Sequence, residues 1–218
     1  MANSTDEISN FKVVLLGKGC VGKTSLVLRY VVDKFNNNNI STVQASFLKK
    51  KLNIDGKRIN LAIWDTAGQE QFHALGPIYY RSSQGAVLVY DITDQDSFQK
   101  VKTWVKELRK MLGNDVYLVI VGNKIDLEKD RHVSLEEAKE YAEKVGATHC
   151  ETSAKLNQGV DEMFFTLTKN MLSISEQKQL FNSTLSRQNS QRRNVIVVDD
   201  EQEPSMSTSK SCCGSSGA

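Results

Sequence analysis

The sequence predicts an α/β fold: a six-stranded, mostly parallel sheet with one antiparallel strand and helices on both faces. The first observation is that apolar runs alternate with segments of helical periodicity from residue 85 onward, as in parallel strands joined by right-handed crossovers. The second is Asp55-Gly56 between two strand-like runs, a strong hairpin signal that predicts the antiparallel strand. The third is that polar or glycine-rich motifs directly follow four of the predicted strands. Because ligands of such sheets bind at the carboxyl ends of the strands, we expect one site at that edge.

The first half of the chain contains three of the predicted strands. An apolar run at 11–17 is expected to form a buried strand and to lead into a helix at 22–32. Residues 33–46 include four consecutive asparagines, which favour a loop. The hairpin strands are expected at 47–54 and 58–64. Residues 66–80 are predicted to be a loop with weak helical content.

The second half alternates regularly between strands and helices. Strands are expected at 85–91, 116–121 and 147–151, and helices at 95–112, 134–145 and 160–174. The helix at 95–112 has apolar residues at helical spacing. The helix at 134–145 begins with Ser134 and carries Glu137 three residues later, the pattern of a capping box.

Length and composition limit the classes of function. The 218 residues have room for one α/β domain at 11–174, with a disordered lead at 1–10 and a flexible hypervariable tail at 175–218 that is rich in Ser, Gln and Asn. A net charge of +2 without a basic run argues against a nucleic-acid partner. The chain shows no signal peptide and no apolar run long enough to span a membrane. We therefore expect a cytosolic chain, in which the four cysteines do not form disulfides.

The stretch Gly-Lys-Gly-Cys-Val-Gly-Lys-Thr at 17–24 predicts a phosphate-binding loop between a strand and a helix. Glycines let backbone N–H groups point at an anion, and the helix N-terminus adds its dipole. The lysine is expected to reach the β- and γ-phosphates, and the threonine hydroxyl to bind Mg²⁺. A glycine-rich turn without a ligand is the structural alternative. The residues expected around the phosphates are Gly17, Gly19, Cys20, Val21, Gly22, Lys23, Thr24 and Ser25.

The motif Asp-Thr-Ala-Gly-Gln at 65–69 follows the third strand. Asp65 at a strand end near Thr24 is expected to hold Mg²⁺ through a water. Gly68 is expected to bring its N–H close to a γ-phosphate because no Cβ intervenes. Gln69 is the candidate catalytic residue, since a neutral amide suits the orientation of an attacking water.

Two further motifs predict selection of guanine. In Asn123-Lys124-Ile125-Asp126, the carboxylate of Asp126 can accept hydrogen bonds from the ring N–H and the exocyclic amine of guanine, a donor pair that adenine lacks. The stem of Lys124 can cover the base, and Asn123 can connect this loop to the phosphate loop. A solvated loop and an ordinary Ser/Ala turn are the bland alternatives for each motif alone. The backbone expected to meet the guanine oxygen belongs to Ser153, Ala154 and Lys155.

With these motifs in this order, residues 11–174 resemble the Ras-like small GTPases, whose G domain is a P-loop NTPase fold. The resemblance implies binding of GTP and GDP with Mg²⁺. It also implies that Thr42 is a Mg²⁺ ligand in the first switch and that Phe35 packs on the guanine. From the residues alone, Thr42 could be a surface hydroxyl and Phe35 a hydrophobic contact at a helix end.

Within this group the chain resembles the Rab family, on account of Trp64 before the Asp-Thr-Ala-Gly-Gln motif, residues 78–81 and a double cysteine near the C-terminus. Residues 44–47, 73–80 and 97–113 resemble most closely the Rab-five-like endosomal members of that family. The resemblance implies that Phe47, Trp64 and Tyr79 bind effectors, although Phe47 and Trp64 could simply pack under the hairpin. Gln44 and Gln71 stand where most Rabs carry Gly and Arg.

The resemblance also implies a membrane anchor and a set of partners. Cys212 and Cys213 are expected to be geranylgeranylated, and two lipid chains anchor a protein stably where one does not. The implied partners are exchange factors, GAPs, effectors, Rab escort protein and GDP-dissociation inhibitor. The expected location of the monomer is the cytosolic face of early endosomes, with a cytosolic pool.

The sequence thus predicts a membrane-anchored GTPase switch in endosomal vesicle trafficking. Its own hydrolysis of GTP should be slow, because the phosphate loop contains no arginine to act in cis. Two alternatives remain at this point. One is a pseudo-GTPase scaffold that binds GTP and effectors without appreciable turnover. The other is a phosphate-loop kinase that uses an adenine nucleotide.

Overall fold

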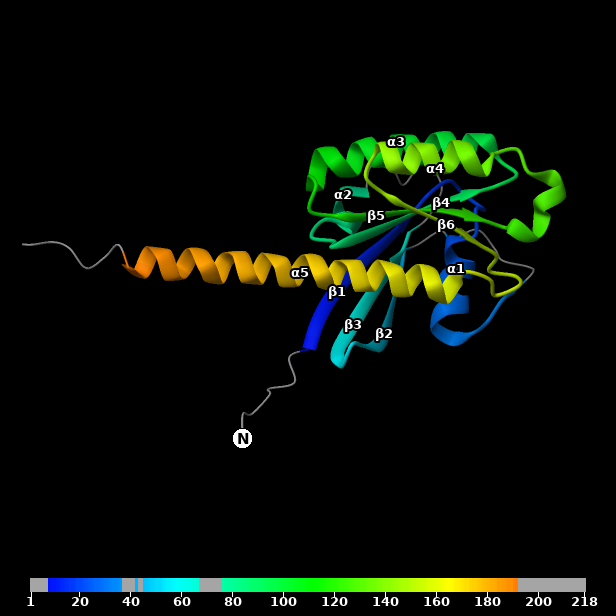
Figure 1. The fold of residues 1–218 in the computed structure, drawn as a ribbon. Helices are drawn as coiled ribbons and strands as arrows, with labels where there is room; N and C mark the ends of the chain where they lie inside the picture. Colours follow the sequence, from blue (N-terminus) through cyan, green and yellow to red (C-terminus); the bar gives the residue numbers. More distant parts are fainter. Residues whose placement is uncertain (1–7, 37–41, 43–44, 67–75, 192–218) are drawn as a thin grey trace, which may run out of the picture. The chain divides into compact units, whose positions relative to one another are not determined.

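The computed structural model describes residues 8–36, 42, 45–66 and 76–191, with side chains up to residue 183. The chain divides into two compact units, Met1–Gln177 and Lys178–Ala218. The first unit contains one six-stranded sheet with the order β2-β3-β1-β4-β5-β6 (Figure 1). β2 is antiparallel to β3, and every other neighbouring pair is parallel. The predicted α/β fold with one antiparallel strand is therefore confirmed.

The strands lie close to their predicted positions. Their bounds are β1 Ile8–Leu16, β2 Ser46–Ile54, β3 Lys57–Asp65, β4 Gly85–Asp91, β5 Tyr117–Asn123 and β6 Thr148–Thr152. The hairpin is also as predicted, because Asp55 (φ 52°) and Gly56 (φ 80°) both have positive φ, which two-residue turns of type I′ require.

Helices cover both faces of the sheet, as Figure 1 shows for α3 and α4 on one side and α1 on the other. Their bounds are α1 Lys23–Val32, α2 Gly76–Tyr80, α3 Gln95–Leu112, α4 Leu135–Lys144 and α5 Val160–Gln191, with a 3₁₀ segment η2 at Ile125–Asp130. Alternate side chains of each central strand enter different cores, since successive strand residues point to opposite faces. In β4, Val87 and Val89 pack in the core under α1 and α5, whereas Leu88 and Tyr90 pack under α3 and α4.

Two predicted boundaries change in the structure. β1 begins at Ile8, so three residues of the expected lead belong to the sheet, where Ile8 pairs with Arg58 and the Asn60 amide donates to Asn10 Oδ1 across 2.9 Å. This part of the strand was not predicted because Ser9 and Asn10 are polar. The last helix runs to Gln191 instead of ending near residue 174. Residues 175–191 are rich in Gln, Ser and Asn, so they show neither a strong helix propensity nor the apolar stripe that marks a packed helix.

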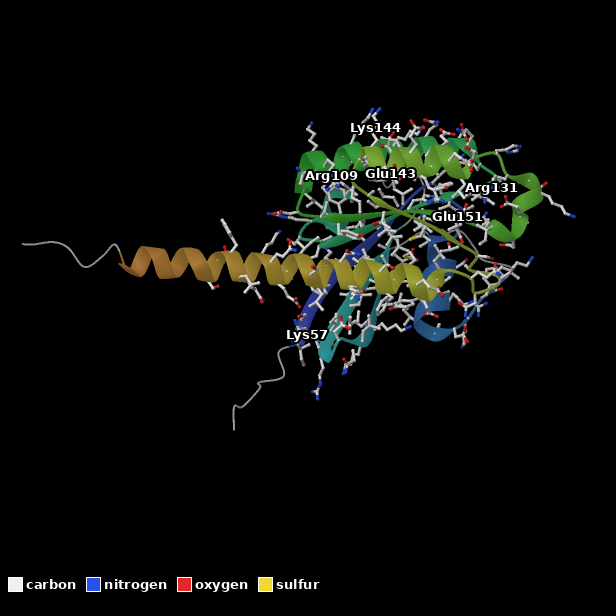
Figure 2. The ribbon with its side chains drawn as sticks, in the orientation of Figure 1. Lys57, Arg109, Arg131, Glu143, Lys144 and Glu151 are labelled. Carbon is white, nitrogen blue, oxygen red and sulfur yellow. The ribbon has the colours of Figure 1, made fainter. Side chains whose placement is uncertain are left out.

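One half of the predicted capping box of α4 is confirmed, because the Ser134 hydroxyl accepts a hydrogen bond from the Glu137 N–H at 3.1 Å. The Glu137 carboxylate contacts Lys102 of α3 at 3.1 Å, which joins the two helices. Nearby, Arg131 forms an ion pair with Glu128 at 2.6 Å. It also pairs with Glu151 of β6 at 2.8 Å, and Figure 2 labels these two residues. Among the described residues, no helix combines the length and the apolar character needed to cross a membrane.

Candidate functional site

The predicted motifs meet at the carboxyl edge of the sheet. Gly17 follows β1, Asp65 ends β3, Asn123 ends β5 and Ser153 follows β6. Parallel strands bring these ends together although the residues lie far apart in the chain. One further strand end belongs here, since Asp91 closes β4.

The phosphate loop needs glycine at two positions for steric reasons. A Cβ at Gly17 would lie 2.3 Å from the carbonyl oxygen of Val89, and Gly17 has φ +150°. At Gly22, with φ +95°, a Cβ would lie 2.4 Å from Asn123 Nδ2. Both glycines therefore allow the loop to pass closer to neighbouring strands than any other residue could. Between them, Cys20 is exposed and has φ 65°.

Lys23 is held inside this loop. Its side chain is 5% exposed, and its ammonium group donates to the carbonyl oxygens of Gly17 and Lys18, both at 3.0 Å. Burial lowers the Lys23 pKa to about 8, although the negative charge of Asp65 opposes this shift. Because this ammonium group has lost its water, a neighbouring anion such as a phosphate group would stabilise its charged form strongly.

The three predicted metal ligands are brought together. The Thr24 hydroxyl donates to Asp65 Oδ2 at 2.7 Å and lies 2.7 Å from the hydroxyl of Thr42. Asp65 is 1% exposed, and burial raises its pKa despite the bond from Thr24 and the charge of Lys23. Its second oxygen, Oδ1, is buried without a hydrogen-bond partner among the described residues. Two hydroxyls and a carboxylate with a free oxygen form a hard-oxygen donor set that fits Mg²⁺.

Asn123 connects the phosphate loop to the two loops expected to bind the base. It is 1% exposed, and its amide nitrogen donates to the carbonyl oxygen of Val21 at 2.9 Å. Its amide oxygen accepts from the Thr152 hydroxyl at 3.1 Å and from the Ala154 N–H at 3.3 Å. Asn123 thus connects its loop to the phosphate loop, as the sequence predicts.

Asp126 and Ser153, predicted from separate motifs, form one cluster. The buried Ser153 hydroxyl donates to Asp126 Oδ1 at 2.6 Å and accepts from the Leu156 N–H at 3.1 Å. Lys124, with φ 69°, extends to Asp91 and forms an ion pair at 2.6 Å. Both loops are thereby fixed by side-chain contacts at the same edge.

The remaining predicted nucleotide contacts in the described part of the chain lie around α1. Ser25 is buried in the first turn of that helix, and Phe35 follows its end, half-buried against the core. Ala154 is 3% exposed, whereas Lys155 is exposed. Arg29 of α1 contacts the loop that carries both residues, and sequence reasoning gave it no role.

The predicted effector residues form a continuous aromatic row on β2, β3 and α2. The ring centroids of Phe47 and Trp64 are 5.2 Å apart, and those of Trp64 and Tyr79 are 6.3 Å apart. Phe47 is 45% exposed. The ammonium of Lys12 lies 4.9 Å from the Trp64 ring centroid and donates to the carbonyl of Arg81 at 2.8 Å, just beyond α2. The aromatic row is therefore accessible to solvent at Phe47, and Lys12 of β1 contacts it at Trp64.

Several predicted residues lie outside the described part of the chain. They are Gln44, Gly68, Gln69, Gln71, Cys212 and Cys213. Gly19 is described and lies in the turn between β1 and α1.

Comparison with known proteins gives consistent results. A model of the Ras family matches residues 12–173. The chain is 64% identical over 207 residues to Ras-related protein Rab-21 of Mus musculus, which covers 94% of this chain and 92% of that protein. It is 65% identical over 209 residues to Ras-related protein Rab-21 of Homo sapiens, covering 95% and 92%. With the protein of the same name from Dictyostelium discoideum the identity is 56% over 200 residues, covering 90% and 94%.

Proposed function

The chain belongs to the Ras family as a Rab-type small GTPase, and from this premise we propose that it is a Mg²⁺-dependent switch that recruits effectors to endosomal membranes. It binds guanine nucleotides and hydrolyses GTP, as its family does. The proposal concerns which residues carry out these steps and what the switch controls.

One observation carries the switch mechanism: the contact of Thr24 with both Asp65 and Thr42. Thr24 belongs to the phosphate loop, Asp65 ends β3, and Thr42 lies between α1 and β2, so three separate segments converge on one point. We assign the two threonines and Asp65 to hold Mg²⁺. When bound there, the ion would neutralise charge on the β- and γ-phosphate oxygens. Loss of the γ-phosphate then loosens the hold on the Thr42 segment, which changes the surface offered to partners.

The phosphate loop and the base loops divide the recognition of the nucleotide. Backbone N–H groups of residues 17–24 and the ammonium of Lys23 bind the phosphates. Asp126 accepts from the guanine ring N–H and amine, and the backbone of Ala154 and Lys155 meets the guanine oxygen. Phe35 packs on the base. An adenine nucleotide would leave the Asp126 carboxylate unpaired, which sites of this kind reject strongly.

Gln69 is assigned to orient the attacking water, with Gly68 at the γ-phosphate. The phosphate loop contains no arginine, so intrinsic hydrolysis is slow, and an arginine supplied by a GAP accelerates it by about 10³–10⁵. Hydrolysis thus acts as a timer for the signalling state.

The output is recruitment of effectors through the aromatic row of Phe47, Trp64 and Tyr79. Aromatic side chains are common at the energetic centres of interfaces, and Phe47 is accessible. Geranylgeranyl groups on Cys212 and Cys213 anchor the protein to the cytosolic face of early endosomes. Rab escort protein and GDP-dissociation inhibitor handle the lipidated form, and exchange factors reload it with GTP.

The first test measures binding of guanine and adenine nucleotides with Mg²⁺, together with single-turnover GTP hydrolysis. We expect tight binding of guanine nucleotides alone, lost in Asp126→Asn, and slow hydrolysis that Gln69→Leu abolishes. Gln69→Leu should still bind GTP, which separates catalysis from binding. Adenine binding would refute the assignment of Asp126, and binding of GTP without turnover would indicate a scaffold.

The second test concerns the output. Trp64→Ala should abolish GTP-dependent capture of effectors and leave GDP dissociation unchanged. Replacing both Cys212 and Cys213 by serine should move the protein from endosomal membranes to the cytosol. An unaltered membrane fraction in the double variant would contradict the proposed anchor.

A further inference from the structure

Arg29 joins the helix after the phosphate loop to the loop after β6. Its side chain is 16% exposed. Its Nε donates to the carbonyl oxygen of Ala154 at 3.0 Å, and a terminal nitrogen lies 3.4 Å from the carbonyl oxygen of Lys155. These contacts span 125 and 126 residues of sequence. They occur at the two residues whose backbone is assigned to the guanine oxygen.

The backbone around Ala154 is held from two directions. Its N–H is bound by the side-chain oxygen of Asn123 from β5, and its carbonyl oxygen is bound by Arg29 from α1. A peptide group is planar, so a hydrogen bond to a carbonyl oxygen also fixes the direction of the N–H on the following residue. Arg29 therefore orients the N–H of Lys155 through the carbonyl of Ala154.

The guanidinium group is itself held in place. One terminal nitrogen donates to Asp33 Oδ1 at 2.8 Å, and Asp33, with φ 51°, caps α1 by donating its N–H to the Arg29 carbonyl at 3.0 Å. The guanidinium carbon also lies 5.9 Å from the ring centroid of Phe35, within the range of a cation–π contact. Several fixed donors acting at once require the planar fork of arginine, which the point charge of lysine does not provide.

We propose that Arg29 is a positioning residue for guanine recognition, which sets the backbone after Ala154 to receive the guanine oxygen. This inference rests on the proposed contact between that backbone and the base. It implies that Arg29 transmits the position of α1, and hence of the phosphate loop, to the base loop. Loss of Arg29 should therefore weaken the hold on the guanine oxygen selectively and leave the contact of Asp126 with the base intact.

The experiment measures dissociation of three diphosphates from the full chain. GDP is the reference. In 6-thio-GDP a sulfur, a weaker acceptor, replaces the guanine oxygen, and in IDP the oxygen stays while the exocyclic amine facing Asp126 is lost. The variants are Arg29→Met, which removes the fork, and Arg29→Lys, which keeps the charge. The matched control is Arg131→Met, since Arg131 is also 16% exposed and ion-paired beside β6.

We expect Arg29→Met to accelerate GDP dissociation about tenfold, the effect of losing a charge-assisted hydrogen bond. Dissociation of IDP should be accelerated equally, because IDP retains the guanine oxygen. Dissociation of 6-thio-GDP should be accelerated clearly less, because its sulfur is the weaker acceptor. Arg29→Lys should fall between wild type and Arg29→Met, which keeps the test valid should Arg29→Met fold poorly. Arg131→Met should leave GDP dissociation close to that of wild type, because its partners Glu128 and Glu151 are not assigned to the nucleotide.

Equal acceleration of GDP and 6-thio-GDP in the Arg29 variants, or an equal effect of Arg131→Met, would overturn the proposal, because either result indicates general loosening. Unchanged GDP dissociation in both Arg29 variants would overturn it as well. If the wild-type protein itself releases GDP and 6-thio-GDP at the same rate, the assigned backbone contact with the guanine oxygen is wrong. That result would refute the proposal at its premise, and it is recognised in the wild-type data alone.

Discussion

The amide nitrogen of Asn123 and the carbonyl oxygen of Val21 lie 2.9 Å apart, although 102 residues separate them in the chain. Because the other end of the same amide accepts from Thr152 and Ala154, one side chain fixes three segments of the site. The loops at the carboxyl edge of the sheet are thus held together by hydrogen bonds of one neutral, fully buried side chain.

Asn123→Ala should therefore cost both stability and affinity. It leaves the buried carbonyl of Val21 and the N–H of Ala154 without their partner, which we expect to lower the free energy of unfolding by about 3 kcal/mol. Nucleotide dissociation should also become faster. Thermal and urea unfolding in the nucleotide-free state measure the first effect. Thr152→Val removes only the hydrogen bond from Thr152 to Asn123, at nearly constant volume, and should lower the free energy of unfolding less. An equal loss of stability in both variants would contradict the central role of Asn123.

Asp65→Asn separates metal binding from stability. The substitution keeps an oxygen that can accept from Thr24 but removes the buried charge, so Mg²⁺ should no longer slow GDP release. Because burial raises the Asp65 pKa, the ionised form is disfavoured in the folded state. The nucleotide-free variant should then be at least as stable as wild type. GDP dissociation measured at increasing Mg²⁺ concentration checks the loss of metal binding, and urea unfolding checks the stability. If Mg²⁺ slows GDP release in the variant as much as in wild type, Asp65 is not a Mg²⁺ ligand.

Nucleotide affinity should fall above pH 8 because of Lys23. Its pKa of about 8 means that the lysine is charged in the free protein at neutral pH and becomes neutral as the pH rises through this value. Binding a phosphate favours the charged form, so above pH 8 the protein must take up a proton to bind. The affinity should therefore be constant below pH 8 and weaken by up to about tenfold per pH unit above it.

Calorimetry in buffers of different ionisation enthalpy measures this proton uptake directly. Uptake should approach one proton per nucleotide as the pH rises above 8 and be clearly smaller in Lys23→Met, whose weaker binding should depend less on pH. Wild-type binding without proton uptake at pH 9 would contradict the prediction.

Acid should destabilise the fold through His149. Burial lowers its pKa to about 4, with the positive charges of Lys139 and Arg131 acting in the same direction, and the Tyr90 hydroxyl lies 3.0 Å from Nε2. Between pH 6.5 and pH 4 the unfolded chain takes up a proton at His149 that the folded chain does not. The free energy of unfolding therefore decreases as the pH is lowered, by at most about 1.4 kcal/mol per pH unit. His149→Gln should flatten this part of the curve. An identical pH dependence of urea unfolding in the two proteins would contradict the assignment.

The sequence predicted those features that depend on local signals. The turn at Asp55-Gly56 and the motifs at strand ends are recognisable because a few adjacent residues determine them, and the parallel sheet then brings the motifs together. Arg29 could not be found in this way. It bonds backbone carbonyls about 125 residues away, which leave no trace in side-chain identity, and on its helix it resembles an ordinary surface charge.

Asp91 lacks a recognisable signal in the sequence for a different reason. It stands at a strand end like the other site residues, but it belongs to no motif, and its pairing with Lys124 depends on how β4 and β5 align. The extension of α5 to Gln191 was not predicted because residues 175–191, rich in Gln, Ser and Asn, show no apolar periodicity.

The close approaches at Gly17 and Gly22 limit how this protein can recover from mutation. A methyl group at Gly17 collides with the main-chain oxygen of Val89, an atom that every amino acid carries, so no second substitution at residue 89 can remove the obstacle. At Gly22 the obstacle is the side chain of Asn123, and truncating it would make space only by cutting the link between the loops. Selection for suppressors of Gly17→Ala should therefore return the original glycine, whereas suppressors of Gly22→Ala should retain weakened nucleotide binding.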